Sequence, residues 1–168
     1  YAIKHTTINR IRDYLQHHDS FVNRCGLYID SPLLTIDPVA RKRHEHRDYR
    51  PLVNARTHQL GKRREIVNSR FHGQYHQLLN VLTYHRDLND EDRMSIVYYM
   101  LLQDRIEEAT QYFAQVNAQK LNTQIQYDYF AAYLDLYSDE HGSARDLAAR
   151  YLNHPVDRWR NAFAAVMK

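Results

Sequence analysis

Apolar residues recur three, four or seven positions apart along most of this chain, which is the pattern of helices that bury one face. Near the start of the sequence this spacing is shown by Ile3, Ile8, Ile11, Tyr14 and Leu15. Thr6 or Thr7 is the expected cap of this helix, and residues 17–20 are its expected end. The sequence as a whole predicts about five to seven helices.

Residues 21–39 interrupt the helical pattern. Their apolar runs are short and are broken by Gly and Pro. Because a proline disfavours helical geometry at the residue before it, we expect a connector here, with no sheet beyond a short pair of strands. Pro38 is well placed to begin a helix capped by Asp37, which would continue through the basic residues 41–47.

The helical pattern strengthens from Leu52 onward. One apolar stripe extends over residues 60–84 and predicts a helix there, with polar residues between the apolar ones. Asn89 or Asp90 is the expected cap of the next helix, because acidic residues follow directly and suit the positive end of a helix dipole.

Residues 90–168 carry a repeating pattern of two helices joined by a tight turn. A final helix over about 156–166 is expected to pack its apolar face on the preceding pair of helices. The four apolar stripes of the two pairs consist of Met94, Val97, Met100 and Leu101; Ile106, Ala109, Phe113 and Val116; Ile125, Tyr129, Ala132, Tyr133 and Leu136; and Ala144, Leu147, Ala148, Tyr151 and Leu152.

The segment 96–116 resembles a tetratricopeptide repeat. In that family a small residue followed four positions later by an aromatic residue marks the second helix, and Ala109 and Phe113 match this pair. Arg93 and Val97 stand where the family has Trp and Gly. The resemblance covers residues 92–155 and implies an all-α fold of stacked antiparallel helical hairpins, an α-solenoid, because each hairpin buries its apolar stripes only by stacking on its neighbours.

Charge divides the sequence into two parts. Residues 1–89 hold 15 Lys and Arg against 8 Asp and Glu and contain nine of the eleven histidines, whereas residues 90–168 hold 8 basic residues against 12 acidic ones. We therefore describe 1–89 as a basic, histidine-rich helical segment and 90–168 as hairpins with a final helix. The basic excess lies between residues 41 and 70, and its densest members are Arg41, Lys42, Arg43, Lys62, Arg63 and Arg64.

This basic patch allows two interpretations. It could hold phosphates of a nucleic acid or an acidic partner surface. The other interpretation is a solvated face, or a face that pairs with the acidic second half of the chain. We expect this other interpretation, because net charge governs association rather than fold.

Candidate chemistry in the sequence is sparse. His72 and His76 are four positions apart, so both imidazoles lie on one helical face at a spacing that can bind a transition metal. A metalloprotease motif needs Glu directly after the first His, where this chain has Gly73. A third ligand, such as His44, His46 or His85, cannot be placed from the sequence, and we expect histidines on a solvated face. The lone Cys25 is expected to be a small buried residue rather than a nucleophile.

Fourteen tyrosines are the strongest anomaly of composition. A tyrosine buries its ring while its hydroxyl finds a partner, so it suits both helix packing and protein-binding surfaces. We expect most to lie in the core and some to line a binding face. Eight of them lie in the second half, and all but Tyr151 cluster between residues 98 and 137: Tyr98, Tyr99, Tyr112, Tyr127, Tyr129, Tyr133 and Tyr137.

These observations predict a non-catalytic helical-repeat scaffold that binds a protein partner or neighbouring domains of its own chain, without metal or other cofactor. The alternative is a nucleic-acid-binding module that uses the basic patch over 41–70. No apolar run is long enough to span a membrane. The sequence begins at Tyr1 and ends inside a helical pattern, so we expect an excerpt of a longer protein; the compartment stays open, with the cytoplasm favoured.

Overall fold

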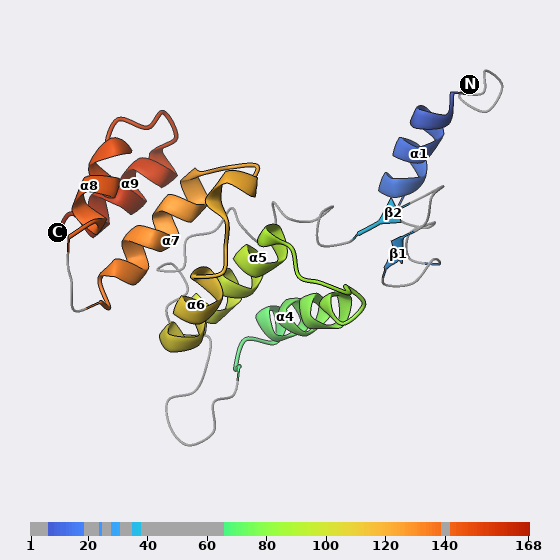
Figure 1. Ribbon diagram of the computed structural model, residues 1–168, viewed down its shortest axis with the longest axis horizontal. Helices are drawn as coiled ribbons and strands as arrows, with labels where there is room; N and C mark the ends of the chain where they lie inside the picture. Colours follow the sequence, from blue (N-terminus) through green and yellow to red (C-terminus); the bar gives the residue numbers. More distant parts are fainter. Residues whose placement is uncertain (1–6, 19–23, 25–27, 31–34, 38–65, 139–141) are drawn as a thin grey trace.

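The computed structural model describes residues 7–18, 24, 28–30, 35–37, 66–138 and 142–168, and these residues are mostly helical. The prediction of an all-α chain is confirmed at this level (Figure 1). The elements in chain order are α1 (Ile8–His17), β1 (Ile29–Asp30), β2 (Thr35–Ile36), α4 (Ser69–Leu82), α5 (Asp90–Leu101), α6 (Ile106–Phe113), the 3₁₀ turn η2 (Ala118–Lys120), α7 (Ile125–Asp135), α8 (Ala144–Arg150) and α9 (Asp157–Val166).

The connector expected over 21–39 contains the short pair of strands. β1 and β2 pair antiparallel, with Ile29 opposite Ile36 and Asp30 opposite Thr35. Thr35 also donates a side-chain hydrogen bond of 3.0 Å to the carboxylate of Asp30. The helix expected from Pro38 through 41–47 lies outside the described residues, as does Cys25.

Helix α4 begins later than the apolar stripe over 60–84 suggests. Asn68 is its N-cap, and the side-chain oxygen of Asn68 accepts a hydrogen bond of 3.0 Å from the backbone N–H of Phe71. Ile66 and Val67 therefore precede the helix, and the Val67 side chain is exposed. The prediction of helix at Ile66 and Val67 is wrong because a capping Asn begins the helix after them even though the apolar spacing extends further towards the N-terminus. The part of the stripe before residue 66 lies outside the described residues.

Helix α5 is the centre of the core. Asn89 caps it as expected, in a capping box in which the Asn89 side chain accepts from the Asp92 N–H and the Asp92 carboxylate accepts from the Asn89 N–H. The prediction of a single apolar stripe on this helix was wrong, since every residue from Met94 to Leu101 is buried. A helix surrounded by neighbours on all sides has no solvated face to keep polar.

Aromatic contacts connect the helices in a consistent order, which Figure 1 shows as a row from α4 to α9. The ring of Tyr99 on α5 lies 5.4 Å from that of Phe71 on α4, and Tyr98 stacks at 6.5 Å on Phe130 of α7. Tyr129, on the same helix α7, meets Phe163 of α9 edge-on at 5.5 Å. Such pairs add to the stability that ring burial gives. The expected packing of α9 is confirmed, since its apolar side chains are buried: Trp159, Phe163 and Val166.

The shorter helices α6 and α8 present small residues to their partners. Ala109 of α6 and Ala148 of α8 are fully buried, and α6 packs on α5 while α8 packs on α7. Phe113 is half-buried and stacks on Tyr127 of α7 with the ring centroids 4.6 Å apart. The two helix pairs therefore touch through α6 as well as through α5.

In the described part of the chain, no helix combines the length and the apolarity that crossing a bilayer requires.

Candidate interaction surface

Two adjacent apolar side chains directly after α7 are exposed beside a buried tyrosine of that helix. Leu136 is 48% exposed and Tyr137 is 56% exposed, whereas Tyr133, one turn earlier, is buried. The rings of Tyr133 and Tyr137 lie 5.5 Å apart, and their hydroxyl oxygens are 3.2 Å apart. We call Tyr133, Leu136 and Tyr137 together the tyrosine surface.

The turn that follows α7 holds the tyrosine surface in place. The backbone N–H of Tyr137 donates to the carbonyl of Leu134, and that of Ser138 donates to the carbonyl of Asp135. The Asp135 side chain then reaches forward to α8, where its carboxylate accepts from the N–H groups of Ser143 and Ala144 at 3.2 and 2.8 Å. Hydrogen bonds within the chain therefore hold the backbone that carries the tyrosine surface.

These contacts also shift the acidity of the residues involved. The hydrogen bond from Ala144, together with those from Ser143 and Ser138, lowers the pKa of Asp135, although burial opposes the effect. Burial raises the pKa of Tyr133 well above its usual range, followed by the hydrogen bond with Tyr137 and the negative charge of Asp104. Tyr133 is thus a neutral phenol at physiological pH, and it presents a hydroxyl that can donate or accept.

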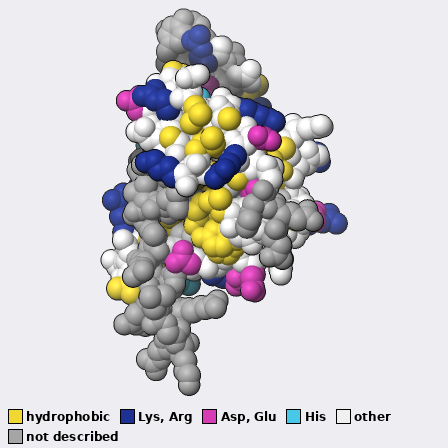
Figure 2. Space-filling view, turned by 90° about the vertical axis from the view of Figure 1, so that its left-hand side faces the viewer, with side chains coloured by type: hydrophobic (Ala, Val, Ile, Leu, Met, Phe, Trp, Pro, Cys, Tyr) yellow, Lys and Arg dark blue, Asp and Glu magenta, His cyan; other side chains and the backbone are white. Residues whose placement is uncertain are grey.

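Figure 2 shows the face that lies over α8, α9 and the end of α7. Hydrophobic side chains gather in the middle of this face, and Lys and Arg side chains lie beside them, with Asp and Glu at the margins. An apolar centre with a charged margin is typical of protein-binding surfaces. A surface of this composition can bind apolar side chains of a partner.

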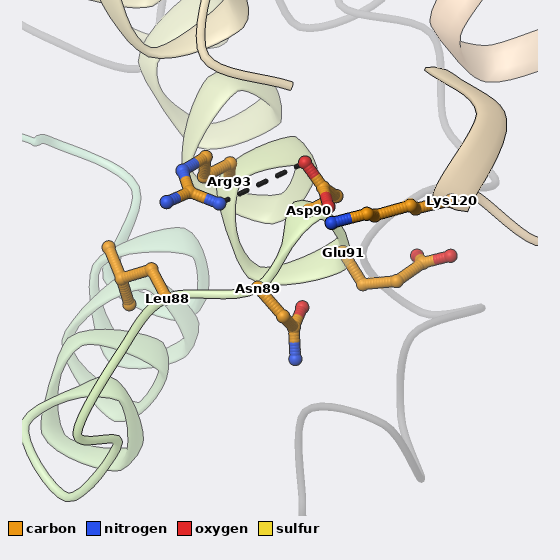
Figure 3. Close-up of a pocket in the computed structure, with 6 residues that line it drawn as sticks. All are labelled: Leu88, Asn89, Asp90, Glu91, Arg93 and Lys120. Atoms are coloured by element: carbon orange, nitrogen blue, oxygen red, sulfur yellow. Dashed lines mark ion pairs between the residues drawn. The ribbon is translucent and has the colours of Figure 1, made fainter. Parts of the chain in front are cut away.

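A second feature is an open polar pocket of about 370 Å³ at the beginning of α5 (Figure 3). Its acidic residues are already engaged within the chain. Asp90 accepts from the backbone N–H of Asn117 at 2.7 Å, and Glu91 accepts from the backbone and side-chain N–H groups of Asn122 at 3.0 and 2.9 Å. Arg93 lies 3.9 Å from the Asp90 carboxylate. The pocket therefore marks the place where the segment between α6 and α7 is fastened to α5.

The basic residues singled out from the sequence lie outside the described residues: Arg41, Lys42, Arg43, Lys62, Arg63 and Arg64. The nucleic-acid alternative therefore stays a prediction.

The histidine pair of α4 lies as its spacing predicts. The rings of His72 and His76 are side by side on the exposed face, with centroids 4.1 Å apart. Of the three candidates for a third ligand, His85 is engaged elsewhere, with Asp92, and the other two lie outside the described residues. Over the described ranges, no group of three His, Cys, Asp or Glu side chains is placed to hold a metal ion.

The tyrosines of the second half divide as expected between core and surface. Tyr98, Tyr99, Tyr129 and Tyr133 are buried, and Tyr137 is exposed. The sequence placed Tyr133 and Leu136 in one apolar stripe but did not indicate that the stripe ends in an exposed patch. The four-residue spacing of Tyr133 and Tyr137 was the available signal, since residues at this spacing meet on a helix.

The described fold defines an all-α chain of consecutive, packed helices with an exposed aromatic patch. No family model and no solved structure matches the chain. Over 109 residues the chain is 33% identical to the actin-binding protein F of Dictyostelium discoideum. The matched segment is 65% of this chain, and the chain spans about 4% of the length of that relative.

Proposed function

We propose that the chain is a non-catalytic scaffold of helical hairpins, of the tetratricopeptide kind, that binds a protein partner within a larger protein. The observation that carries the proposal is the tyrosine surface. Tyrosine rings bury a large area at a low cost in side-chain entropy, and they are enriched among the residues that dominate binding energy.

The packing of the helices supports the hairpin arrangement. Ala109 lies fully buried where α6 meets α5, as expected for the small residue of a tetratricopeptide repeat, and Ala148 lies in the same situation on α8. Phe113, the aromatic residue of the motif, contacts the next helix pair through Tyr127. A stack of this kind extends by adding hairpins and presents a continuous surface to a partner.

The chemistry of the tyrosine surface indicates what it binds. Leu136 and Tyr137 offer apolar area, and the hydroxyls of Tyr133 and Tyr137 offer hydrogen bonds. Asp104 adds a negative charge close enough to raise the pKa of Tyr133. This combination fits an apolar segment of a partner with a basic residue beside it. The similarity to an actin-binding protein makes filamentous actin the partner to test.

The test is cosedimentation of the purified chain with actin filaments. We expect the wild-type chain to sediment with the filaments, and the double replacement Leu136→Ala and Tyr137→Ala to weaken binding by at least about tenfold, because each residue is expected to contribute about 1 kcal/mol or more. Tyr84→Ala is the matched control, since Tyr84 is similarly exposed but lies after α4.

Two results would count against the proposal. A wild-type chain that stays in the supernatant at filament concentrations of tens of micromolar would remove actin as the partner. Binding weakened equally by Tyr84→Ala would show that the tyrosine surface is not the contact.

A further inference from the structure

His85 is a buried histidine at the place where the N-terminal strands meet the helices. It follows α4 in the turn that leads to α5, and its side chain is only 6% exposed. Its Nδ1 lies 2.8 Å from Oδ2 of Asp92, and its Nε2 lies 3.7 Å from Oδ2 of Asp37. Two carboxylates, from segments 55 positions apart in the sequence, therefore lie at opposite edges of one imidazole ring.

The hydrogen bonds around Asp92 assign one proton of this ring. Oδ2 of Asp92 accepts a hydrogen bond of 3.1 Å from the backbone N–H of Asn89, and the same oxygen faces Nδ1 of His85. Because this oxygen acts as an acceptor, Nδ1 carries the hydrogen.

The second ring nitrogen is the unusual one. Nε2 of His85 is buried and has no hydrogen-bond partner among the described residues. In the neutral ring Nε2 carries a lone pair. This lone pair faces the Asp37 carboxylate with no hydrogen-bond donor between the two acceptors, and such an arrangement is unfavourable. In the protonated ring Nε2 carries a hydrogen, so that positive charge meets negative charge on both sides.

The groups that face His85 come from both segments packed on it. Tyr28, directly before β1, places its ring centroid 4.7 Å from that of His85, and Asp37 follows directly after β2; Asp92 comes from α5. Burial raises the pKa of Tyr28, and Asp30, Asp37 and Asp92 raise it further, so Tyr28 stays neutral throughout the range in which histidine titrates. Ile36 of β2 is buried, with 2% of its surface exposed.

We propose that His85 is a proton-controlled clasp. When its ring carries both protons, it bridges Asp37 and Asp92 and holds β1 and β2 against the turn between α4 and α5. When the ring loses the Nε2 proton, the attraction to Asp37 is lost and the strands loosen. The clasp is therefore tight while the ring carries both protons and weak once the ring is neutral.

The experiment measures hydrogen exchange at the backbone amides of β1 and β2 in the full chain, corrected for the intrinsic pH dependence of exchange. We expect protection at about pH 5.5 to exceed protection at about pH 8 by roughly tenfold, the factor that corresponds to one charge-assisted hydrogen bond. Asp37→Asn should remove this pH dependence while it leaves the contact between His85 and Asp92 in place.

Two further variants separate the clasp from other effects. His85→Gln should also abolish the pH dependence, whereas His72→Gln, which removes an exposed histidine of α4, should leave it unchanged. Helix content of each variant is checked by circular dichroism, and if His85→Gln does not fold, Asp37→Asn still decides. Protection that is equal at the two pH values in the wild type, or that keeps its pH dependence in Asp37→Asn, would overturn the proposal.

Discussion

Replacement of Phe163 tests the packing of α9 on the preceding helices. This side chain is fully buried. Its ring stacks on Tyr151 at 4.4 Å and meets Tyr129 edge-on at 5.5 Å. Phe163→Ala should lower the free energy of unfolding by about 3–5 kcal/mol, which combines the lost burial with the cavity left behind.

Phe163→Leu separates the ring contacts from the burial of volume. Leucine fills most of the space but loses the ring contacts with Tyr151, Tyr129 and Trp159. The two closer pairs are each worth about 0.5–1.5 kcal/mol, so we expect a loss of about 1–3 kcal/mol. Val156→Ala is the control, because Val156 is 46% exposed and its truncation should change stability by no more than about 0.5 kcal/mol.

The assay is equilibrium unfolding in urea followed by far-UV circular dichroism. With a denaturant slope of about 2 kcal/mol per molar urea, the midpoint should fall by about 1.5–2.5 M for Phe163→Ala and by about 0.5–1.5 M for Phe163→Leu. A midpoint for Phe163→Ala as close to the wild type as that of Val156→Ala would mean that α9 does not pack as described.

Three other outcomes are expected. Asp135→Ala should lower the free energy of unfolding by about 1 kcal/mol near neutral pH, because α8 loses its cap. The pKa of Asp135 is lowered in the folded chain, so the stabilisation by this carboxylate is present above the ordinary carboxyl range and is lost as pH falls below about 4. The stability curves of wild type and variant should therefore converge at low pH. Tyr151→Phe should lower the free energy of unfolding in urea by about 1.5 kcal/mol, because the Tyr151 hydroxyl donates a hydrogen bond of 2.6 Å to Asp128. Burial and this hydrogen bond raise the pKa of Tyr151 to about 12, so the stabilisation by the hydroxyl is present below about pH 10 and is lost as pH rises towards 12. The basic patch should bind DNA and RNA no better than a generic basic protein does. Sub-micromolar binding at physiological salt that is abolished when Lys62, Arg63 and Arg64 are replaced together by Gln, with a fall of about 2.7 in the slope of log affinity against log salt, would instead support the nucleic-acid alternative.

The sequence predicted the residue type of the tyrosine surface but not its position. The abundance of tyrosine in the second half predicted both core and surface roles, and this was confirmed. The position of the exposed patch was not predicted, because exposure at the end of α7 depends on where the neighbouring helices stop.

Local order was determined by the sequence itself. Spacing of apolar residues predicted α9 and the helix pairs of the second half, Gly and Pro predicted a connector over 21–39 with no more than a short pair of strands, and capping preferences placed the beginning of α5 at Asn89 or Asp90. These features depend on residues a few positions apart, whose geometry a helix or a turn fixes without help from the rest of the chain.

Tertiary structure decided which faces are buried and which polar groups meet. The sequence predicts a single buried face for helix α5, yet the helix is buried all round because α4, α6 and α7 enclose it. Asp135 caps α8 from the preceding helix, and His85 lies between carboxylates of two distant segments. Contacts of this kind join residues far apart in the chain, so no local period encodes them, and they arise only when stacking brings the elements together.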